Sequence, residues 1–472
     1  MKRITYLLIL LFTGSVHAAD KPNILVLLSD DLPWNMLGYQ GGQVVATPHI
    51  DRIANEGAQL NQFYTQSVCT PTRASFMTGR YPFRNGTIAR FNQSGGMLLD
   101  ERTLANAMQE AGYWTAIVGK WHLGNWESEY LPRQRGFDHQ YGTYGGVIDY
   151  YDRRRNGRIY DWHRNDEPLL EEGYTTDLIG NEAVRLIENQ SGEKPFFMYV
   201  AFTAVHSPHQ APENVVSYYQ KKYAENARSE SPLTKKKGEI AAMAHVMDQN
   251  IGRILHAIEA RDWTENTLVV FFNDNGGSGY ANANLPLRGT KASYWDGGTK
   301  VPFAAQWPGK IKAGTVVDEP VMVVDLYPTL IKLAGGSLEQ PLPIDGLDIW
   351  PVIAEGAETP REEFIWSPKV IRHKGWKLID SGGQYYEHGV KGRQELASGT
   401  PSEAQLYNIA EDPYEENNLI NDHPEMVRSL RKRLSEIQRE IRPAAPVERL
   451  PRNVKITGKE ENSRFKGWGE LE

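Results

Sequence analysis

The sequence contains a single cysteine, Cys69, and the residues that follow it suggest a chemical role for its thiol. Pro71 suits the first turn of a helix, so Cys69 would stand at a helix N-terminus, where free backbone N–H groups favour anions. Arg73 comes four residues after the cysteine, so its guanidinium can return to the same face of the helix. These residues alone fit a reactive cysteine and an ordinary helix start equally well.

The other residues with chemical potential occur in small clusters after apolar segments. There are four such clusters: Asp30-Asp31, Lys120-Trp121-His122, His206 and Asp274-Asn275. Taken singly, each acidic pair is more often a turn after a strand, and each basic group is more often an ordinary surface or loop residue. Their functional meaning therefore depends on whether the fold brings them together.

The elements that would position these clusters alternate between strands and helices. Apolar runs predict buried strands at residues 23–29, 114–118, 195–202 and 267–272. Helical periodicity is found after Thr47-Pro48 and at residues 103–111, 176–188 and 240–260. This alternation predicts an α/β fold with a mostly parallel sheet and helices on both faces. Because ligands in such folds bind beyond the carboxyl ends of the strands, the four clusters are expected to meet at one rim.

The chain is expected to consist of a leader and two domains. Residues 1–18 combine a basic start, an apolar stretch and a small-residue cleavage site, which predicts a secretory signal peptide. Glycines and prolines interrupt the periodicity between residues 336 and 362, so we place a large domain at 19–350 and a smaller α+β domain at 351–472. In the smaller domain we expect a short antiparallel sheet (363–366, 376–380, 405–408), a long helix (423–441) and a polar tail.

Composition and charge exclude several classes of protein. The 472 residues include 52 basic and 59 acidic ones, so the net charge is −7, without the basic excess of a general nucleic-acid binder. No segment after the leader approaches 18 consecutive apolar residues, so we expect no membrane span and a periplasmic or secreted protein. Exported proteins usually use their cysteines in disulfides, so the single Cys69 requires another explanation.

The string from Cys69 to Arg73, followed by Thr78-Gly79-Arg80, resembles the signature of type I sulfatases. The resemblance extends, in the family's order, to residues 47–66, 119–124 (GKWHLG), 273–277 (NDNGG), 287–291 (LRGTK) and 406–419. It implies an alkaline-phosphatase-like fold and a cysteine that a separate maturation enzyme oxidises to formylglycine, an aldehyde. That modification would explain why an exported chain keeps one cysteine.

The resemblance also implies a metal site and a catalytic set. Asp30, Asp31, Asp274 and Asn275 match the family's metal ligands, and such an all-oxygen set suits one Ca²⁺ ion. The hydrated aldehyde at residue 69 would attack the sulfate sulfur. By resemblance, Arg73 and Lys120 would stabilise the formylglycine. His122 would orient its hydrate and accept a proton, and His206 with Lys291 would contact the sulfate and the departing sugar oxygen.

The substrate is expected from the same resemblance. Residues 282–298 and 204–212 are most similar to the arylsulfatase B-like branch, which implies sulfated galactose or N-acetylgalactosamine units, as in a carrageenan-like galactan or a galactosaminoglycan, and exo action. Aromatic faces and polar tips suit sugar rings, so the candidate sugar contacts are Trp34, Tyr39, Trp162 and His209. The run Arg153-Arg154-Arg155 is either a site for a sulfated chain or a solvated loop.

Three other functions compete with this interpretation. A two-zinc phosphatase or phosphodiesterase, which would use serine or threonine as nucleophile, is disfavoured because the chain offers one hard-cation site and the cysteine of the Cys69–Arg73 string. His206 and His209 could suggest a zinc pair, but no third soft ligand lies nearby in the sequence. A non-catalytic polysaccharide-binding protein is disfavoured by the intact catalytic set. A formylglycine-dependent phosphonate monoester hydrolase remains open on sequence grounds.

Overall fold

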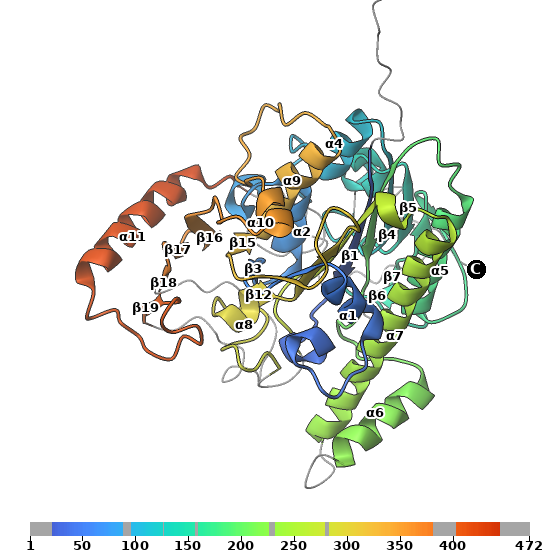
Figure 1. Cartoon of the computed structure of the whole chain (residues 1–472), viewed down its shortest axis with the longest axis horizontal. Helices are drawn as coiled ribbons and strands as arrows, with labels where there is room; N and C mark the ends of the chain where they lie inside the picture. The colour runs from blue at the N-terminus through green and yellow to red at the C-terminus, as the bar shows by residue number, and fades with distance from the viewer. Residues whose placement is uncertain are drawn as a thin grey trace, which may run out of the picture.

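The computed structural model describes residues 21–87, 96–125, 127–155, 159–225, 232–278, 283–380 and 403–443. The predicted signal peptide and the predicted tail beyond residue 443 lie outside these residues. Figure 1 shows a large sheet with helices on both sides and a smaller layer that carries α11 (Pro424–Ile437). Among the described helices, none is long and apolar enough to cross a membrane.

The large sheet has ten strands. In spatial order they are β14 (Thr315–Val317), β2 (Ala58–Leu60), β13 (Phe303–Gln306), β11 (Thr267–Asn273), β1 (Asn23–Ser29), β10 (Phe196–Ala201), β4 (Trp114–Gly119), β5 (His139–Gly142), β8 (His163–Arg164) and β9 (Glu167–Pro168). Its centre, from β11 to β5, is parallel, whereas β13, β2, β8 and β9 add antiparallel pairings towards the edges. The predicted α/β fold with a mostly parallel sheet is confirmed.

The sheet separates two hydrophobic clusters because successive side chains of a strand point to opposite faces. In β1, Ile24, Val26 and Leu28 belong to one cluster, and Leu25 and Leu27 belong to the other. The first face is covered by α2 (Cys69–Thr78), α4 (Leu104–Glu110) and α9 (Leu326–Leu333). The second is covered by α1 (Pro48–Asn55), α5 (Thr175–Asn189) and α7 (Pro232–Ala260), and α6 (Glu213–Glu225) packs on α7.

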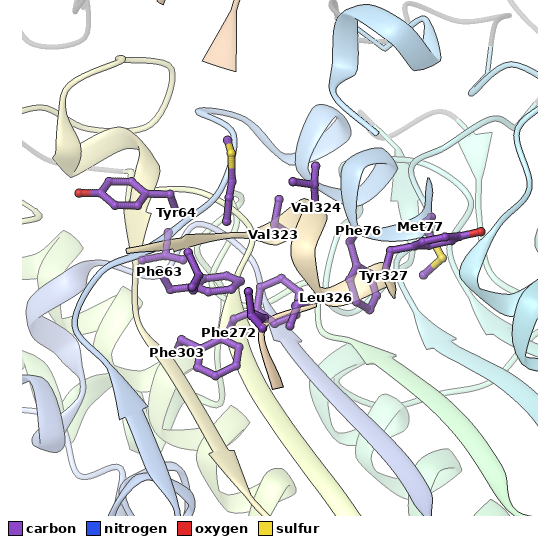
Figure 2. Packing of buried hydrophobic residues seen from close by; sticks show 14 of the residues in the cluster. Phe63, Tyr64, Phe76, Met77, Phe272, Phe303, Val323, Val324, Leu326 and Tyr327 are labelled. Carbon is purple, nitrogen blue, oxygen red and sulfur yellow. The ribbon is translucent and has the colours of Figure 1, made fainter. Parts of the chain in front are cut away.

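An aromatic cluster fixes α2 against the sheet (Figure 2). Phe76 of α2 lies 5.5 Å from Phe272 of β11, measured between ring centroids. Phe63 packs between Phe272 and Phe303, at 5.5 Å and 4.5 Å. Edge-to-face and tilted contacts of this kind add to the burial of apolar area. The position of Cys69, at the start of α2, is therefore set by the core.

The C-terminal part forms a second, antiparallel sheet. Its strands are β16 (Glu363–Ser367), β17 (Val370–His373), β18 (Trp376–Ile379) and β19 (Gln405–Asn408), and α11 packs near β17. The predicted helix at 423–441 is α11 followed by a short 3₁₀ helix, Gln438–Glu440. This sheet shares the hydrophobic cluster of α2, and the Trp366 indole N–H donates to the Thr65 carbonyl at 2.9 Å, close to Cys69 in sequence.

The remaining elements are short. Two small sheets contain β12 (Lys300–Val301), β3 (Phe63–Tyr64) and β15 (Val321–Met322), and β6 (Arg154–Arg155) with β7 (Ile159–Tyr160). The short helices are α3 (Pro82–Asn85), α8 (Asp296–Thr299) and α10 (Trp350–Glu355), together with 3₁₀ turns. The predicted boundary at residue 350 falls at the first residue of α10.

Candidate active site

Four neighbouring strands end at the same edge of the large sheet. Ser29 of β1 is opposite Asn273 of β11, Leu28 is opposite Ala201 of β10, and Ala201 is opposite Gly119 of β4. Asp30-Asp31, Asp274-Asn275 and Lys120-Trp121-His122 directly follow β1, β11 and β4, and His206 lies five residues after the end of β10. The expectation that these clusters meet at one rim is therefore met by the register of the sheet.

The helix that begins at Cys69 enters this rim from the side. All residues of α2 are buried, and Cys69 itself is 3% exposed. Its neighbour Thr72 accepts the Gln66 backbone N–H through its hydroxyl at 3.0 Å, which satisfies a donor just before the helix. The Ala292 N–H donates to the Ser67 carbonyl at 2.8 Å, so the loop that carries Lys291 is held against the segment before the cysteine.

Arg73 connects three of the converging loops. Its Nη2 donates to Asp274 Oδ2 at 2.9 Å and to Asp30 Oδ2 at 3.4 Å, and its Nη1 donates to the Lys120 carbonyl at 3.1 Å. Lys120 Nζ lies 2.5 Å from Asp30 Oδ2. These side chains are completely buried, so the ion pairs form in a medium where an uncompensated charge would be costly.

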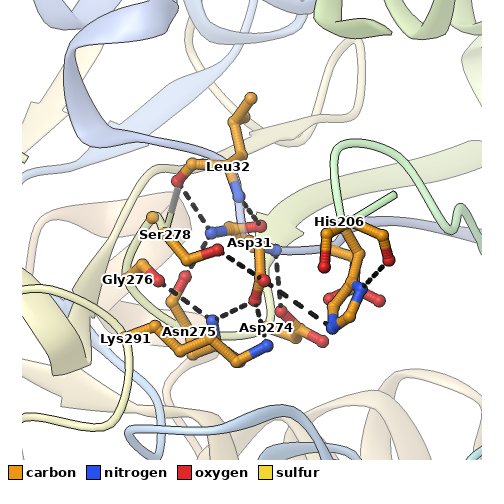
Figure 3. Close-up of polar contacts among 12 residues, drawn as sticks. Asp31, Leu32, His206, Asp274, Asn275, Gly276, Ser278 and Lys291 are labelled. Carbon is orange, nitrogen blue, oxygen red and sulfur yellow. Dashed lines mark hydrogen bonds and ion pairs between the residues drawn. The ribbon is translucent and has the colours of Figure 1, made fainter. Parts of the chain in front are cut away.

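The candidate metal ligands are joined by direct contacts (Figure 3). Asn275 Nδ2 donates to Asp31 Oδ1 at 2.8 Å, and the Asp31 N–H donates to Asp274 Oδ1 at 3.3 Å. Ser278 Oγ donates to Asp31 Oδ2 at 2.8 Å. Asp30, Asp31 and His206 each present an atom within 4.8 Å of the others.

Lys291 and His206 lie beside Asp31. Lys291 Nζ is 2.6 Å from Asp31 Oδ1, and His206 Nε2 is 3.8 Å from Asp31 Oδ2. The other ring nitrogen of His206, Nδ1, is 2.6 Å from the Ser207 carbonyl. A carbonyl can only accept, so Nδ1 carries a proton and Nε2 faces the carboxylate cluster.

Burial and neighbouring charges shift the pKa values of the acidic groups in opposite directions. Burial would raise the pKa of Asp30, but Lys120, His206 and Arg73 lower it below its ordinary value. Burial and the charge of Asp30 raise the pKa of Asp274 to about 7. Each group responds to burial and to its charged neighbours, which is typical of functional sites.

Both histidines of the site are neutral at pH 7. Burial, followed by the charges of Lys120 and Arg73, lowers the pKa of His122 well below its ordinary value. Burial and the charge of Lys291 lower the pKa of His206 to about 4. Asp31 and His122 both have a backbone φ of 60°, a conformation that residues other than glycine rarely adopt and that often accompanies function.

The donor set fits a hard divalent cation. Asp30 Oδ1 and Asn275 Oδ1 are buried and make no hydrogen bond to the described residues, so each has an oxygen available for a ligand. A coordinating carboxylate is deprotonated, so in the cation-bound site Asp30, Asp31 and Asp274 would together carry three negative charges, which Arg73, Lys120 and Lys291 balance while His122 and His206 are neutral. An added divalent cation would give the site a net positive charge, which suits an anionic substrate. Oxygen donors suit Ca²⁺.

The four candidate sugar contacts occupy different environments. Trp34 is 9% exposed, with Lys300 Nζ at 5.5 Å from its ring. Tyr39 packs against the α1–α7 side of the core, and His209 is half-buried in the loop that contains His206. Trp162 is completely buried, its indole N–H donating to Glu171 at 2.6 Å and its ring packing on Tyr141. It presents no surface to a sugar, so the sequence prediction for Trp162 is corrected.

Two residues of the site, Thr70 and Asn284, were not predicted from the sequence. Thr70 Oγ1 lies 3.3 Å from Nδ1 and 3.2 Å from Nε2 of His122. Asn284 accepts the Trp34 and Gly277 N–H groups at 3.1 and 2.9 Å, which holds the loop after β11 against the loop after β1. Thr70 lies inside the cysteine motif, which is the one signal that could have identified it. Asn284 lies within residues 282–298, which carry part of the family resemblance, but nothing in that string marked it as a loop-holding residue.

Comparison with known proteins identifies the class of protein that this fold and site define. Residues 22–337 match the sulfatase family, and residues 290–440 match the family described as N-sulphoglucosamine sulphohydrolase, C-terminal. Arylsulfatase J of Mus musculus is 32% identical, over 95% of this chain and 82% of its own length. N-acetylgalactosamine-6-sulfatase of Homo sapiens is 32% identical, over 75% and 70%. The chain belongs to the sulfatase family, and it is an enzyme that hydrolyses sulfate esters.

Several solved structures share the fold of this chain. Ps i-CgsB is 28% identical with a TM-score of 0.77, covering 89% of this chain and 94% of its own. Its complex with k-i-k-neocarrahexaose gives a TM-score of 0.76 at 27% identity, with the same coverage. The phosphonate monoester hydrolase of Agrobacterium radiobacter has a TM-score of 0.60 at 18% identity, covers 89% of this chain and 96% of its own, and shares the fold alone.

Proposed function

We propose that this sulfatase removes sulfate from galactose or N-acetylgalactosamine units of a sulfated polysaccharide or oligosaccharide, with formylglycine made from Cys69 and one Ca²⁺ ion. The observation that carries the proposal is the position of Cys69. It begins the buried helix whose Arg73 pairs with Asp30 and Asp274, and the loop of Lys291 is held against the segment just before it. We infer that a maturation enzyme oxidises this residue before the protein acts.

Once residue 69 is oxidised, the hydrated aldehyde supplies a hydroxyl that attacks the sulfate sulfur. Asp30, Asp31, Asp274 and Asn275 would hold the ion, which would help neutralise the sulfate oxygens. Lys120 and Arg73 are held near residue 69 by ion pairs with Asp30 and Asp274 and place two cationic side chains there. Preorganised cations of this kind stabilise negative charge that develops in the transition state.

Proton transfer is assigned to the two histidines and Lys291. A neutral His122 can accept a proton from the second hydroxyl of the hydrate, so that the C=O bond of the aldehyde re-forms as the C–O bond to the sulfate breaks and sulfate leaves. The adjacent Thr70 hydroxyl orients the imidazole. Lys291, whose pKa is raised by Asp31 against the effect of burial, stays positive and contacts the sulfate. An anionic substrate would raise the pKa of His206, so that its Nε2 can donate a proton to the sugar oxygen as the S–O bond breaks.

Two similar proteins support the proposed substrate class. One is an N-acetylgalactosamine-6-sulfatase, and the other, Ps i-CgsB, has been solved in complex with k-i-k-neocarrahexaose. We propose exo action at a chain end, with Trp34, Tyr39 and His209 as the sugar contacts. Residues 1–18 support export to the periplasm or the medium.

The first test is the mass of the tryptic peptide that covers residues 53–73, from protein co-expressed with a formylglycine-generating enzyme. We expect the aldehyde mass at residue 69, together with turnover of an aryl sulfate that is lost after treatment with a calcium chelator and restored by Ca²⁺. If residue 69 were an unmodified thiol in a preparation that still turns over the aryl sulfate, the formylglycine mechanism would be refuted. A strong preference for an aryl phosphonate over the aryl sulfate would favour the phosphonate hydrolase instead.

A further inference from the structure

The arginine run at residues 153–155 divides into three different environments. Arg153 is buried, and its Nη1 donates to the Gly173 carbonyl at 2.8 Å. Arg154 is exposed, with its guanidinium carbon 6.0 Å from the centroid of the Tyr160 ring. Arg155, the next residue of β6, points to the opposite side of the hairpin because side chains alternate along a strand. Its side chain is 19% exposed.

Two adjacent glycines, Gly145 and Gly146, leave room for the Arg155 side chain and the His122 ring to lie next to each other. A Cβ added to Gly145 would lie 2.6 Å from Arg155 Nε, and a Cβ added to Gly146 would lie 2.3 Å from His122 Nε2. The guanidinium and the catalytic imidazole therefore pack on neighbouring residues of one loop. After burial, Lys120, Arg73 and His206, Arg155 is a further charge that lowers the pKa of His122, in keeping with this proximity.

Asp161 anchors the same loop. Its Oδ1 accepts the Tyr144 N–H at 3.0 Å and its Oδ2 accepts the Gly145 N–H at 2.8 Å. The His122 N–H in turn donates to the Tyr144 carbonyl at 3.1 Å. The Arg155 Nη1 atom is 3.8 Å from Asp161 Oδ2, a long ion pair to a carboxylate that already accepts two backbone hydrogen bonds. Arg155 is therefore placed beside the loop of Gly145 and Gly146, next to the residue on which the His122 imidazole packs.

We propose that Arg155 binds a second anionic group of the sulfated sugar chain, a sulfate or a carboxylate other than the sulfate that is hydrolysed. A partly exposed guanidinium beside the reacting centre can donate two parallel hydrogen bonds to such a group. This inference rests on the proposed function and narrows its substrate to sugars that carry at least two anionic groups. Of the three arginines, Arg155 thus selects the substrate, Arg153 supports the fold and Arg154 lies at the surface.

The experiment compares four substrates of the matured enzyme. They are an aryl sulfate, N-acetylgalactosamine 6-sulfate, N-acetylgalactosamine 4,6-disulfate and a disaccharide with one 6-sulfate and one uronate carboxylate. We expect the wild type to prefer one of the last two over the monosulfated sugar. In Arg155→Gln that preference, expressed as a ratio of kcat/KM values, should fall about tenfold or more, chiefly through KM. The substrate for which it falls identifies the anion as sulfate or carboxylate.

Arg154→Gln is the matched control, since it removes the same charge from the other side of the hairpin and should leave the ratio unchanged. Arg155→Lys should restore the preference in part, because it keeps the charge without the paired donors. An equal fall in kcat/KM for all four substrates in Arg155→Gln would show a structural role and overturn the proposal. An unchanged ratio in this variant, or a wild type without the preference, would also overturn it. If the wild type hydrolyses none of the four, the proposed function fails, and this inference fails with it.

Discussion

Arg73 and Asp274 are 201 residues apart in the sequence and form a two-point ion pair that is inaccessible to solvent. Arg73 Nε and Nη2 donate to the same carboxylate oxygen at 3.1 and 2.9 Å. The guanidinium thereby fixes the helix of Cys69 to the loop that supplies two of the candidate metal ligands. One residue thus links the position of the nucleophile to that of the metal site.

Replacing Arg73 with methionine should destabilise the protein by about 3–5 kcal/mol, because Asp30 and Asp274 would lose a buried countercharge. Hydrolysis should be lost in the same variant. Urea denaturation measures the first effect. Arg428→Met is the control, since Arg428 pairs with Glu425 on the exposed face of α11 and its removal should cost about 1 kcal/mol or less. Equal unfolding free energies for Arg73→Met and the wild type would contradict the assignment.

Replacing Cys69 with alanine should abolish hydrolysis while leaving the fold nearly unchanged. The side chain is buried, and losing one sulfur atom should cost about 1 kcal/mol of stability. Turnover of an aryl sulfate and the thermal unfolding temperature are the two measurements. Activity equal to that of the matured wild type would reject the role of residue 69.

Gly146→Ala tests the placement of His122. The added methyl group would lie 2.3 Å from two atoms of the imidazole, and the φ of Gly146 lies outside the left-handed range that favours glycine, so the ring has to move. A displacement of about 1 Å at a catalytic group can lower kcat about 100-fold. We expect this loss with an unfolding temperature close to that of the wild type. A kcat within twofold of the wild-type value would show that His122 does not need this position.

Much of the rim was predictable from the sequence because it is built by sheet register. The strand that ends at Ser29 and the strand that ends at Asn273 are nearly continuous apolar runs. Because the two strands are parallel and in register, the residues after them lie at the same edge of the sheet. The buried start of α2 was likewise indicated by Pro71. Local patterns of this kind specify strand ends and helix starts well.

The parts that were not predictable depend on tertiary packing. An aromatic residue such as Trp162 is a reasonable candidate for a sugar contact. In the structure, however, it is completely buried and its ring packs on Tyr141. Arg153 and Arg155 are two residues apart, yet one supports the fold and the other reaches the loop of His122. The sequence gives no period or motif that separates these cases, since long-range hydrogen bonds decide them.

Lys377→Met tests the junction between the two sheets. Lys377 Nζ lies 2.8 Å from both Asp296 Oδ1 and Glu415 Oε1, all fully or almost fully buried. Removing this ammonium leaves two buried carboxyl groups without their cation and should cost about 3–5 kcal/mol. Because Asp296 follows the loop that carries Lys291, kcat should also fall.

Lys374→Met, at an exposed pair with Glu362, is the control and should change stability by about 1 kcal/mol or less. Equal losses in both variants would contradict this view.

Asp248 should make the stability depend on pH. It is buried on α7, and its Oδ1 accepts the N–H groups of His49 and Ile50 at 3.1 and 2.8 Å at the start of α1. Burial raises its pKa from 3.8 to about 7. Between these values the native state binds more protons than the unfolded state, so this group's contribution to stability is full below pH 4 and is lost as the pH rises to about 7.

Asp248→Asn does not titrate and keeps an acceptor for Ile50. Its unfolding free energy relative to the wild type should therefore increase between pH 5 and 7 and level off above pH 7, as measured by urea denaturation. A difference that stays constant across that range would show that the carboxyl of Asp248 is already ionised at pH 5.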